Sequence, residues 1–170
     1  MRRSAAASSF WAARRSAPDL ELLLVGTGAE KEALEALISE LDAGAFVKFA
    51  GRVNDDELVD IYRSAWVVAS TSVREGWGMT LTEAAACGTP ALATRIAGHV
   101  DAVHEGVSGL LADDDAEIAR LLARIITDAN LRQRLSDGAL SHASRFNWAN
   151  TATRIMETLA DEAHGRPGLR

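Results

Sequence analysis

The sequence EGWGMTLTEAAACGTP occupies residues 75–90 and decides how the rest of the chain is interpreted. It places Glu75 on a turn broken by glycines and Glu83 about one turn into the helix that follows. We expect that helix to run from about Met79 to Cys87 and to end at Gly88, since glycine commonly stops a helix. Two carboxylates eight positions apart therefore lie at the junction between a turn and a helix start.

This junction suits a ligand that carries both phosphates and hydroxyls. Gly76 and Gly78 have no Cβ, so the backbone can approach a ligand closely. The helix start offers unpaired N–H groups and a partial positive charge, which favour phosphate. Carboxylates accept hydrogen bonds from hydroxyl groups. A nucleotide sugar has both kinds of group and is the expected type of ligand.

Strands and helices alternate on both sides of this junction. Short apolar runs bounded by turn residues predict strands at residues 20–25, 46–49, 66–70, 91–94 and 109–112. The first of these reads as a buried parallel strand. Helices are predicted from near residue 29 and from the capping box of Asn54 and Glu57 to Tyr62. Three more helices are predicted by an apolar face over 118–125, from about residue 130 to 144, and by an apolar face over 152–159. The fold class is therefore α/β, a Rossmann-like parallel sheet with helices on both faces.

Ligands of such sheets lie at the carboxyl ends of the strands. Gly26, Arg52, the Glu75 turn and the predicted loop 94–99 all fall at that edge. The strand assignment alone therefore brings the candidate site residues to one side of the sheet.

The bulk composition describes an ordinary globular domain. We expect the 170 residues to form one domain, 1–170, with loose ends at 1–9 and 164–170. A hydrophobic content of 48% is ordinary for such a domain. The net charge of −6 argues against nucleic-acid binding, which would need a basic face. Cys87 is the only cysteine, which excludes an internal disulfide and is compatible with a reducing cytoplasm.

No apolar run approaches the roughly 18 residues that a membrane span needs. The first fifteen residues begin like a signal or transit peptide, but Arg14 and Arg15 interrupt the apolar stretch. We expect a helix there and a cytoplasmic protein, with peripheral association at a membrane as a minor alternative.

The motif and its flanks resemble a known family. The pattern from Glu75 to Glu83 resembles the Glu-x7-Glu signature of retaining glycosyltransferases with the GT-B architecture, in particular glycosyltransferase family 4. The likeness covers roughly residues 10–163 and includes these flanking segments: 18–28, 49–53, 58–62, 96–103, 106–111 and 146–148. The resemblance implies the C-terminal, donor-binding domain of such an enzyme.

The resemblance also implies a role for each matching residue. Glu83 would bind the ribose hydroxyls, and Glu75 would contact the transferred sugar near the reacting carbon. Arg52 and Val53 match the turn that holds the base, although the Arg52 side chain could equally be a surface charge. Backbone amides of five residues would line the sugar diphosphate: Gly76, Trp77, Gly78, Met79 and Thr80. Trp77 could instead be a packing residue.

The remaining candidates are weaker. Gly26 and Gly28 match a turn that borders the pocket. The alternative is that these glycines only form the turn and have no contact with a ligand. His99 and His104 lack the acidic or thiol partners that a metal site needs, so no metal is expected. His99 could reach the pocket from the loop after the fourth strand. The family implies no cofactor besides its donor substrate.

The sequence departs from the family in what precedes the matching segments. From the extent of the resemblance we expect neither the acceptor-binding N-terminal domain nor the first strand of the donor domain, with its Arg and Lys, in this sequence. We therefore expect a donor-binding part that is inactive alone, and whose acceptor domain could lie on another chain. The alternative is a non-catalytic binding or docking module. An incomplete sheet also suggests self-association through its free edge, and the last helix would expose an apolar side.

Two other classes of enzyme fit poorly. Gly26 and Gly28 begin like a dinucleotide-binding fingerprint, but Lys31 occupies the third glycine position. No acidic residue ends the next strand to bind a ribose. A serine hydrolase fails because residues 106–109 do not complete the Gly-x-Ser-x-Gly spacing.

Overall fold

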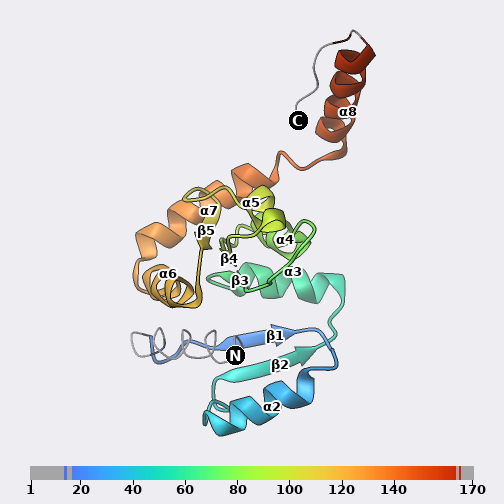
Figure 1. Cartoon of the computed structure of the whole chain (residues 1–170). Helices are drawn as coiled ribbons and strands as arrows, with labels where there is room; N and C mark the ends of the chain where they lie inside the picture. The colour runs from blue at the N-terminus through green and yellow to red at the C-terminus, as the bar shows by residue number, and fades with distance from the viewer. Residues whose placement is uncertain (1–13, 15–16, 164, 166–170) are drawn as a thin grey trace.

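Two small parallel sheets form the centre of the protein (Figure 1). The computed structural model describes residues 14, 17–163 and 165. In the first sheet, β1 (Leu22–Val25) pairs with β2 (Val47–Gly51). In the second, β4 (Ala91–Thr94) lies between β3 (Val68–Ser70) and β5 (Gly109–Ala112). Parallel strands flanked by helices confirm the predicted Rossmann-like class.

The helices follow the strands in alternation and then close the C-terminal half. In Figure 1, α2 (Lys31–Glu40) lies on one side of β1 and β2, and α3 (Asp55–Ser64) lies on the other. The other helices surround the second sheet or follow it: α4 (Met79–Ala86), α5 (Ala97–Ala102), α6 (Asp115–Thr127), α7 (Ala129–Ala143) and α8 (Trp148–Ala163).

Local sequence signals explain where several helices begin and end. Asn54 and Glu57 form the predicted capping box at the start of α3, with N–H···O distances of 2.8 and 2.9 Å. Gly78 starts α4 in the left-handed conformation, with φ +80°. Gly88 follows the end of α4 with φ +82°, and its carbonyl accepts a 2.6 Å hydrogen bond from Ser136 of α7. Glycine has access to this region without a Cβ penalty.

The main core joins the two sheets. Phe46 and the partly buried Leu22 belong to the first sheet region, and they pack in one cluster with Leu92, Leu110 and Ile125. A second cluster lies between α4, α5 and the second sheet, and includes Leu81, Ala93 and Val103. The second sheet is therefore buried on both faces, as parallel sheets generally are.

The first sheet departs from the sequence prediction. Residues 20–25 were expected to form a buried strand, but the residues of β1 alternate between half-buried and exposed, and Leu23 and Val25 are both 42% exposed. The structure also has two sheets where one was expected. Leu23 and Val25 are alternate residues and share one face of β1, so this face is the one left partly uncovered. Within the described residues no strand pairs with the outer edge of β1 or of β3.

The segment after β4 also differs from its prediction. A loop was expected over residues 94–99, whereas residues 97–102 form the short helix α5. Six residues that include Gly98 carry almost no helical signal, because glycine is a poor helix former. Tertiary contacts of Gly98 and His99 fix this helix in place, and they are described below.

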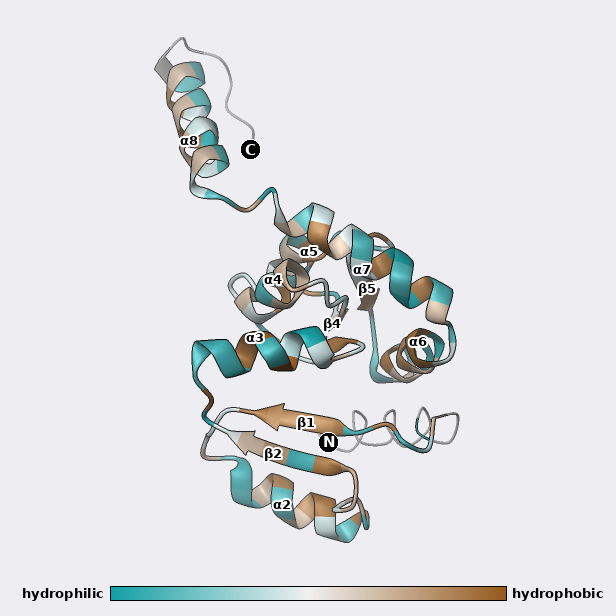
Figure 2. Cartoon of the chain, turned by 180° about the vertical axis from the view of Figure 1, so that it is seen from behind, coloured by the Kyte–Doolittle hydropathy of each residue, from teal (hydrophilic) through white to brown (hydrophobic). Residues whose placement is uncertain are grey.

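The chain ends fall largely outside the described residues. Only Arg14 of the helix expected over the first fifteen residues is described, and only Gly165 of the expected loose ends 1–9 and 164–170. Of the described helices, none is long and apolar enough to cross a membrane. Figure 2 shows α8 set apart from the sheets. As expected, it exposes apolar side chains, with Trp148 89% and Met156 65% exposed.

A close contact between α7 and the turn before β5 yields a stability prediction. A Cβ placed on Gly138 would lie 2.0 Å from the Val107 carbonyl oxygen. Alanine favours a helix over glycine by about 1 kcal/mol, so without this contact Gly138→Ala would stabilise α7. We expect the clash to dominate and Gly138→Ala to lower the free energy of unfolding by about 1–3 kcal/mol in urea denaturation.

The matched control is Gly44→Ala. A Cβ on Gly44 meets no atom within 4 Å, and its φ is not positive. This substitution should leave the free energy of unfolding within about 0.5 kcal/mol of wild type, or raise it slightly. Equal stability of Gly138→Ala and wild type would contradict the close packing of α7 on Val107.

Candidate functional site

The turn from Glu75 to Gly78 connects β3 to α4 and is the centre of the candidate site. Glu75 is exposed in the turn, and Glu83 is exposed on α4 one turn after its start. The predicted arrangement of one carboxylate on a turn and one on a helix is therefore the arrangement in the structure. Both side chains face solvent and are accessible to a ligand.

The backbone at this junction is open. A Cβ placed on Gly76 would meet no atom within 4 Å. No side chain caps the N-terminus of α4, so its first amides keep their hydrogen-bonding capacity. Met79 is 65% exposed, and Thr80 is exposed beside it. An anion can approach these amides without displacing a side-chain cap.

Tyr62 orients Glu83, and the sequence analysis missed this role. The Tyr62 hydroxyl on α3 donates a 3.1 Å hydrogen bond to Glu83 Oε2. Burial raises the pKa of Tyr62, and the hydrogen bond to Glu83 raises it further, so the phenol stays protonated and remains a donor. Thr89 in turn donates to the Tyr62 carbonyl. In the sequence Tyr62 appears only as the end of the short helix that begins at the Asn54–Glu57 capping box, and nothing there links it to Glu83.

The first turn of α5 supports the Glu75 turn from behind. A Cβ on Gly98 would lie 2.6 Å from the Glu75 carbonyl oxygen and 2.8 Å from the Trp77 nitrogen. The two backbones are thus in direct contact, and only glycine fits at residue 98. His99 is fully buried next to this contact. It therefore does not project into the site from a loop, which the sequence analysis had considered.

Aromatic contacts join the turn to the end of α7. Trp77 packs edge-on against Phe146 with ring centroids 5.4 Å apart, and Phe146 packs in the same way against His142 at 4.9 Å. Trp77 is still 39% exposed. The Trp77 side chain thus packs on Phe146 while part of it stays exposed, and its backbone amide remains a candidate for the diphosphate.

The turns after β1 and β2 form a second group of candidate residues. The Gly26 N–H donates a 2.7 Å hydrogen bond to the Gly51 carbonyl, which places Gly26 beside Arg52 and Val53. Gly26 has φ +111°, a conformation that requires glycine, whereas Gly28 is not among the residues with positive φ. Arg52 is exposed, and Val53 is half-buried.

Both groups lie at the carboxyl ends of their strands, as predicted. Between the described residues, no hydrogen bond or ion pair links the Gly26 group to the Glu75 turn. The structure therefore brings together Gly26, Arg52 and Val53 on one sheet and Glu75–Glu83 on the other. A ligand that spans both groups would have to bridge the two sheets.

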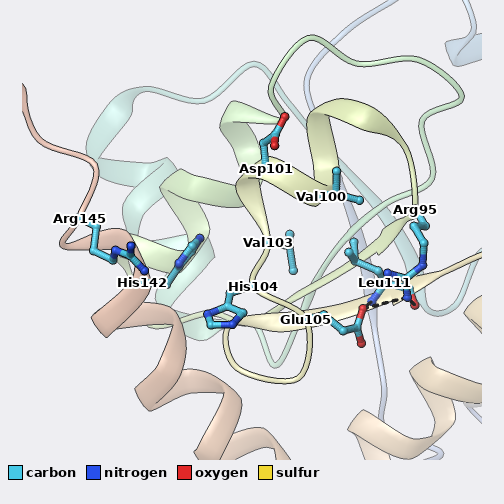
Figure 3. Close-up of a pocket in the computed structure, with 9 residues that line it drawn as sticks. All are labelled: Arg95, Val100, Asp101, Val103, His104, Glu105, Leu111, His142 and Arg145. Carbon is cyan, nitrogen blue, oxygen red and sulfur yellow. Dashed lines mark hydrogen bonds and ion pairs between the residues drawn. The ribbon is translucent and has the colours of Figure 1, made fainter. Parts of the chain in front are cut away.

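A separate hollow of about 400 Å³ lies on the other side of α5 (Figure 3). It contains none of the predicted site residues. At one end Arg95 forms hydrogen-bonded ion pairs with Glu105 and Asp113, at 3.1 and 2.9 Å, so its charge is already balanced. His104 and His142 lie at the other end. The candidate site remains the Glu75 turn, where the uncapped start of α4 lies between two exposed carboxylates.

The described residues include no group of three or more His, Cys, Asp or Glu side chains arranged to hold a metal ion. His99 and His104 in particular do not form such a group.

Parallel sheets flanked by helices, with this turn between strand and helix, define the C-terminal domain of a GT-B glycosyltransferase. The chain belongs to the family of glycosyl transferases group 1, whose model matches residues 5–142.

Curated relatives in this family are named D-inositol 3-phosphate glycosyltransferase. The protein of Acidothermus cellulolyticus is 41% identical over 134 residues, which are 78% of this chain and 30% of the relative. The protein of Corynebacterium urealyticum is 42% identical over 135 residues, 78% of this chain and 32% of the relative. The chain thus matches about a third of the length of these relatives.

Solved structures agree in fold. HepE of Anabaena in complex with UDP and glucose is 28% identical, with a TM-score of 0.75 over 90% of this chain and 44% of HepE. Sucrose-phosphate synthase of Thermosynechococcus elongatus is also 28% identical, with a TM-score of 0.78 over 96% of this chain and 43% of the synthase.

The His142 side chain beside the site predicts a pH dependence of stability. Burial lowers the pKa of His142, and the nearby His104 and Arg145 act in the same direction, although a hydrogen bond to the Ala102 carbonyl opposes them. The unfolded chain therefore binds a proton more readily than the folded chain does. The neutral His142 ring is therefore compatible with full stability above the unfolded pKa of about 6.5, and the free energy of unfolding decreases as the pH falls below that value.

Urea denaturation at pH 7.5 and 5.5 tests this dependence. Wild type should lose more stability between the two pH values than His142→Gln, which keeps an amide donor but does not titrate. The carboxylates are common to both proteins, so the difference between the two slopes isolates His142. Identical slopes would show that His142 is not the group responsible.

Proposed function

We propose that this chain is the donor-binding part of a retaining glycosyltransferase that transfers a hexose from a nucleoside-diphosphate sugar to an acceptor hydroxyl. The observation that carries the proposal is the uncapped start of α4, between the two exposed carboxylates Glu75 and Glu83. Membership of the family and the UDP complexes of HepE support it. We infer a uridine nucleotide as the first donor to test.

Different parts of the donor would contact the two groups of residues. The backbone amides from Gly76 to Thr80, including those of Trp77, Gly78 and Met79, would hold the sugar diphosphate. Glu83 would accept hydrogen bonds from the ribose hydroxyls while Tyr62 holds one of its oxygens. Charged acceptors form stronger hydrogen bonds than neutral ones. Arg52 and Val53 would hold the base, and Gly26 and Gly28 would border it.

Glu75 would act on the transferred sugar. Its carboxylate would bind sugar hydroxyls and stabilise positive charge as the bond from C1 to the diphosphate oxygen breaks. The electron pair of that bond leaves with the nucleoside diphosphate. The acceptor oxygen then bonds to C1 on the same face, and its proton passes to the leaving diphosphate. In this proposal Glu75 is not a nucleophile.

A second proposal is a non-catalytic module that binds a nucleotide sugar or docks to another chain. The unpaired edges of β1 and β3 and the exposed apolar side of α8 favour it, because each could receive a partner. The partner would be an acceptor-binding domain on another chain or a second copy of this chain. Transferase activity that appears on mixing with an acceptor-binding domain would favour the enzyme over the module.

The donor site is tested by calorimetric titration of the chain with GDP, UDP, ADP and their sugar conjugates. We expect one nucleotide to bind and Glu83→Gln to weaken its binding by about 1.5–3 kcal/mol, the value of a hydrogen bond to a charged group. Glu75→Gln should instead reduce discrimination between the sugar conjugates, since Glu75 faces the sugar.

The matched control is Glu157→Gln on α8, which changes the charge equally on an exposed residue outside the site. It should bind as wild type does. Equal affinity of wild type, Glu75→Gln and Glu83→Gln for every nucleotide sugar would contradict the site assignment.

A further inference from the structure

His99 is a polar residue in an unusual position. It is fully buried, although α5 is only six residues long and lies between the Glu75 turn and the sheet. Burying a polar ring is costly unless its nitrogens are hydrogen-bonded. Both nitrogens have partners here, and these partners lie on two different strands.

The hydrogen bonds fix the tautomer of the ring. His99 Nδ1 lies 2.8 Å from the Thr94 carbonyl oxygen, which can only accept, so Nδ1 carries the proton. The Thr94 hydroxyl donates to the Ser72 carbonyl at 2.6 Å and does not compete for that role. In the neutral ring Nε2 is then an acceptor, and the Ser70 hydroxyl, 3.1 Å away, donates to it. The ring thus joins the carboxyl ends of β3 and β4.

The same ring supports the glycine turn. A Cβ placed on Gly78 would lie 3.1 Å from His99 Cδ2, so the ring edge fills the space directly beneath Gly78. The preceding residue, Gly98, meets the Glu75 carbonyl and the Trp77 nitrogen. Residues 98 and 99 therefore contact the turn at both of its ends, through the backbone at one and the imidazole at the other.

We propose that His99 is a positioning residue of the donor site. It does not contact the donor, because its ring is buried and both nitrogens are engaged. It holds Gly78 in the left-handed conformation that starts α4, and so directs the amides of Gly76–Thr80 toward the diphosphate. This inference rests on the proposed donor site for its functional consequence, whereas its structural part stands on the contacts of His99 alone.

The test compares His99→Phe with His104→Phe. Phenylalanine keeps an aromatic ring beneath Gly78 but removes both hydrogen bonds, leaving Thr94 and Ser70 without this partner. His104 is exposed five residues later, and a ring substitution there should leave the turn unchanged. Amide hydrogen exchange is measured at Leu81, whose N–H bonds to the Gly78 carbonyl, with the amides of β5 and α6 as internal references.

We expect His99→Phe to speed exchange of the Leu81 amide by about tenfold relative to the reference amides, because an unpaired buried polar group costs the equivalent of about one decade in an equilibrium constant. UDP or UDP-sugar affinity should fall by a similar factor, while His104→Phe leaves both unchanged. Unchanged exchange at Leu81 in His99→Phe would overturn the proposal.

Ser70→Ala covers the case in which His99→Phe does not fold. It removes the hydrogen bond to Nε2 and keeps the imidazole ring, and should speed exchange of the Leu81 amide by about threefold; no change would again overturn the proposal. If wild type binds no nucleotide sugar, the proposed function fails, and exchange at Leu81 still decides whether His99 holds the turn.

Discussion

The backbone contact between Gly98 and the Glu75 turn is the constraint on which the candidate site depends. No side chain fits between the two segments, because a Cβ on Gly98 would come within 2.6 Å of the Glu75 carbonyl oxygen. The contact ties the turn after β3 to the helix after β4. It thereby sets where α4 begins, where its free amides point and where Glu75 stands relative to Glu83. His99 adds a second support at Gly78.

Around this contact, two of the helices also support the site. α3 supplies Tyr62, which holds the Glu83 carboxylate. The segment after α7 supplies Phe146, which packs against Trp77, and His142 of α7 packs in turn against Phe146. The site is therefore held from three sides while its solvent face stays open. A rigid frame with exposed amides and carboxylates suits recognition of a ligand with phosphates and hydroxyls, because the hydrogen-bonding groups of the protein are oriented before the ligand arrives.

Much of this could be predicted from the sequence because the signals were local. The capping box of Asn54 and Glu57, the stop at Gly88 and the apolar run of β4 each depend on a few neighbouring residues. What could not be predicted depends on contacts between distant segments. α5 contains a glycine that only its contact with the Glu75 turn explains, and nothing in the sequence links Tyr62 to Glu83. The exposure of one face of β1 likewise depends on what packs against that face.

The central claim is that nucleotide sugars bind at the Glu75 turn, and an amide-resolved NMR titration with UDP-glucose tests it most directly. The account predicts that the amides of Gly76–Thr80 and Glu83 shift most, with smaller shifts at Gly26 and Val53 where the base would lie. Shifts confined to the hollow between α5 and α7, around His104 and His142, would contradict it. So would the absence of any shift in the turn at saturating ligand.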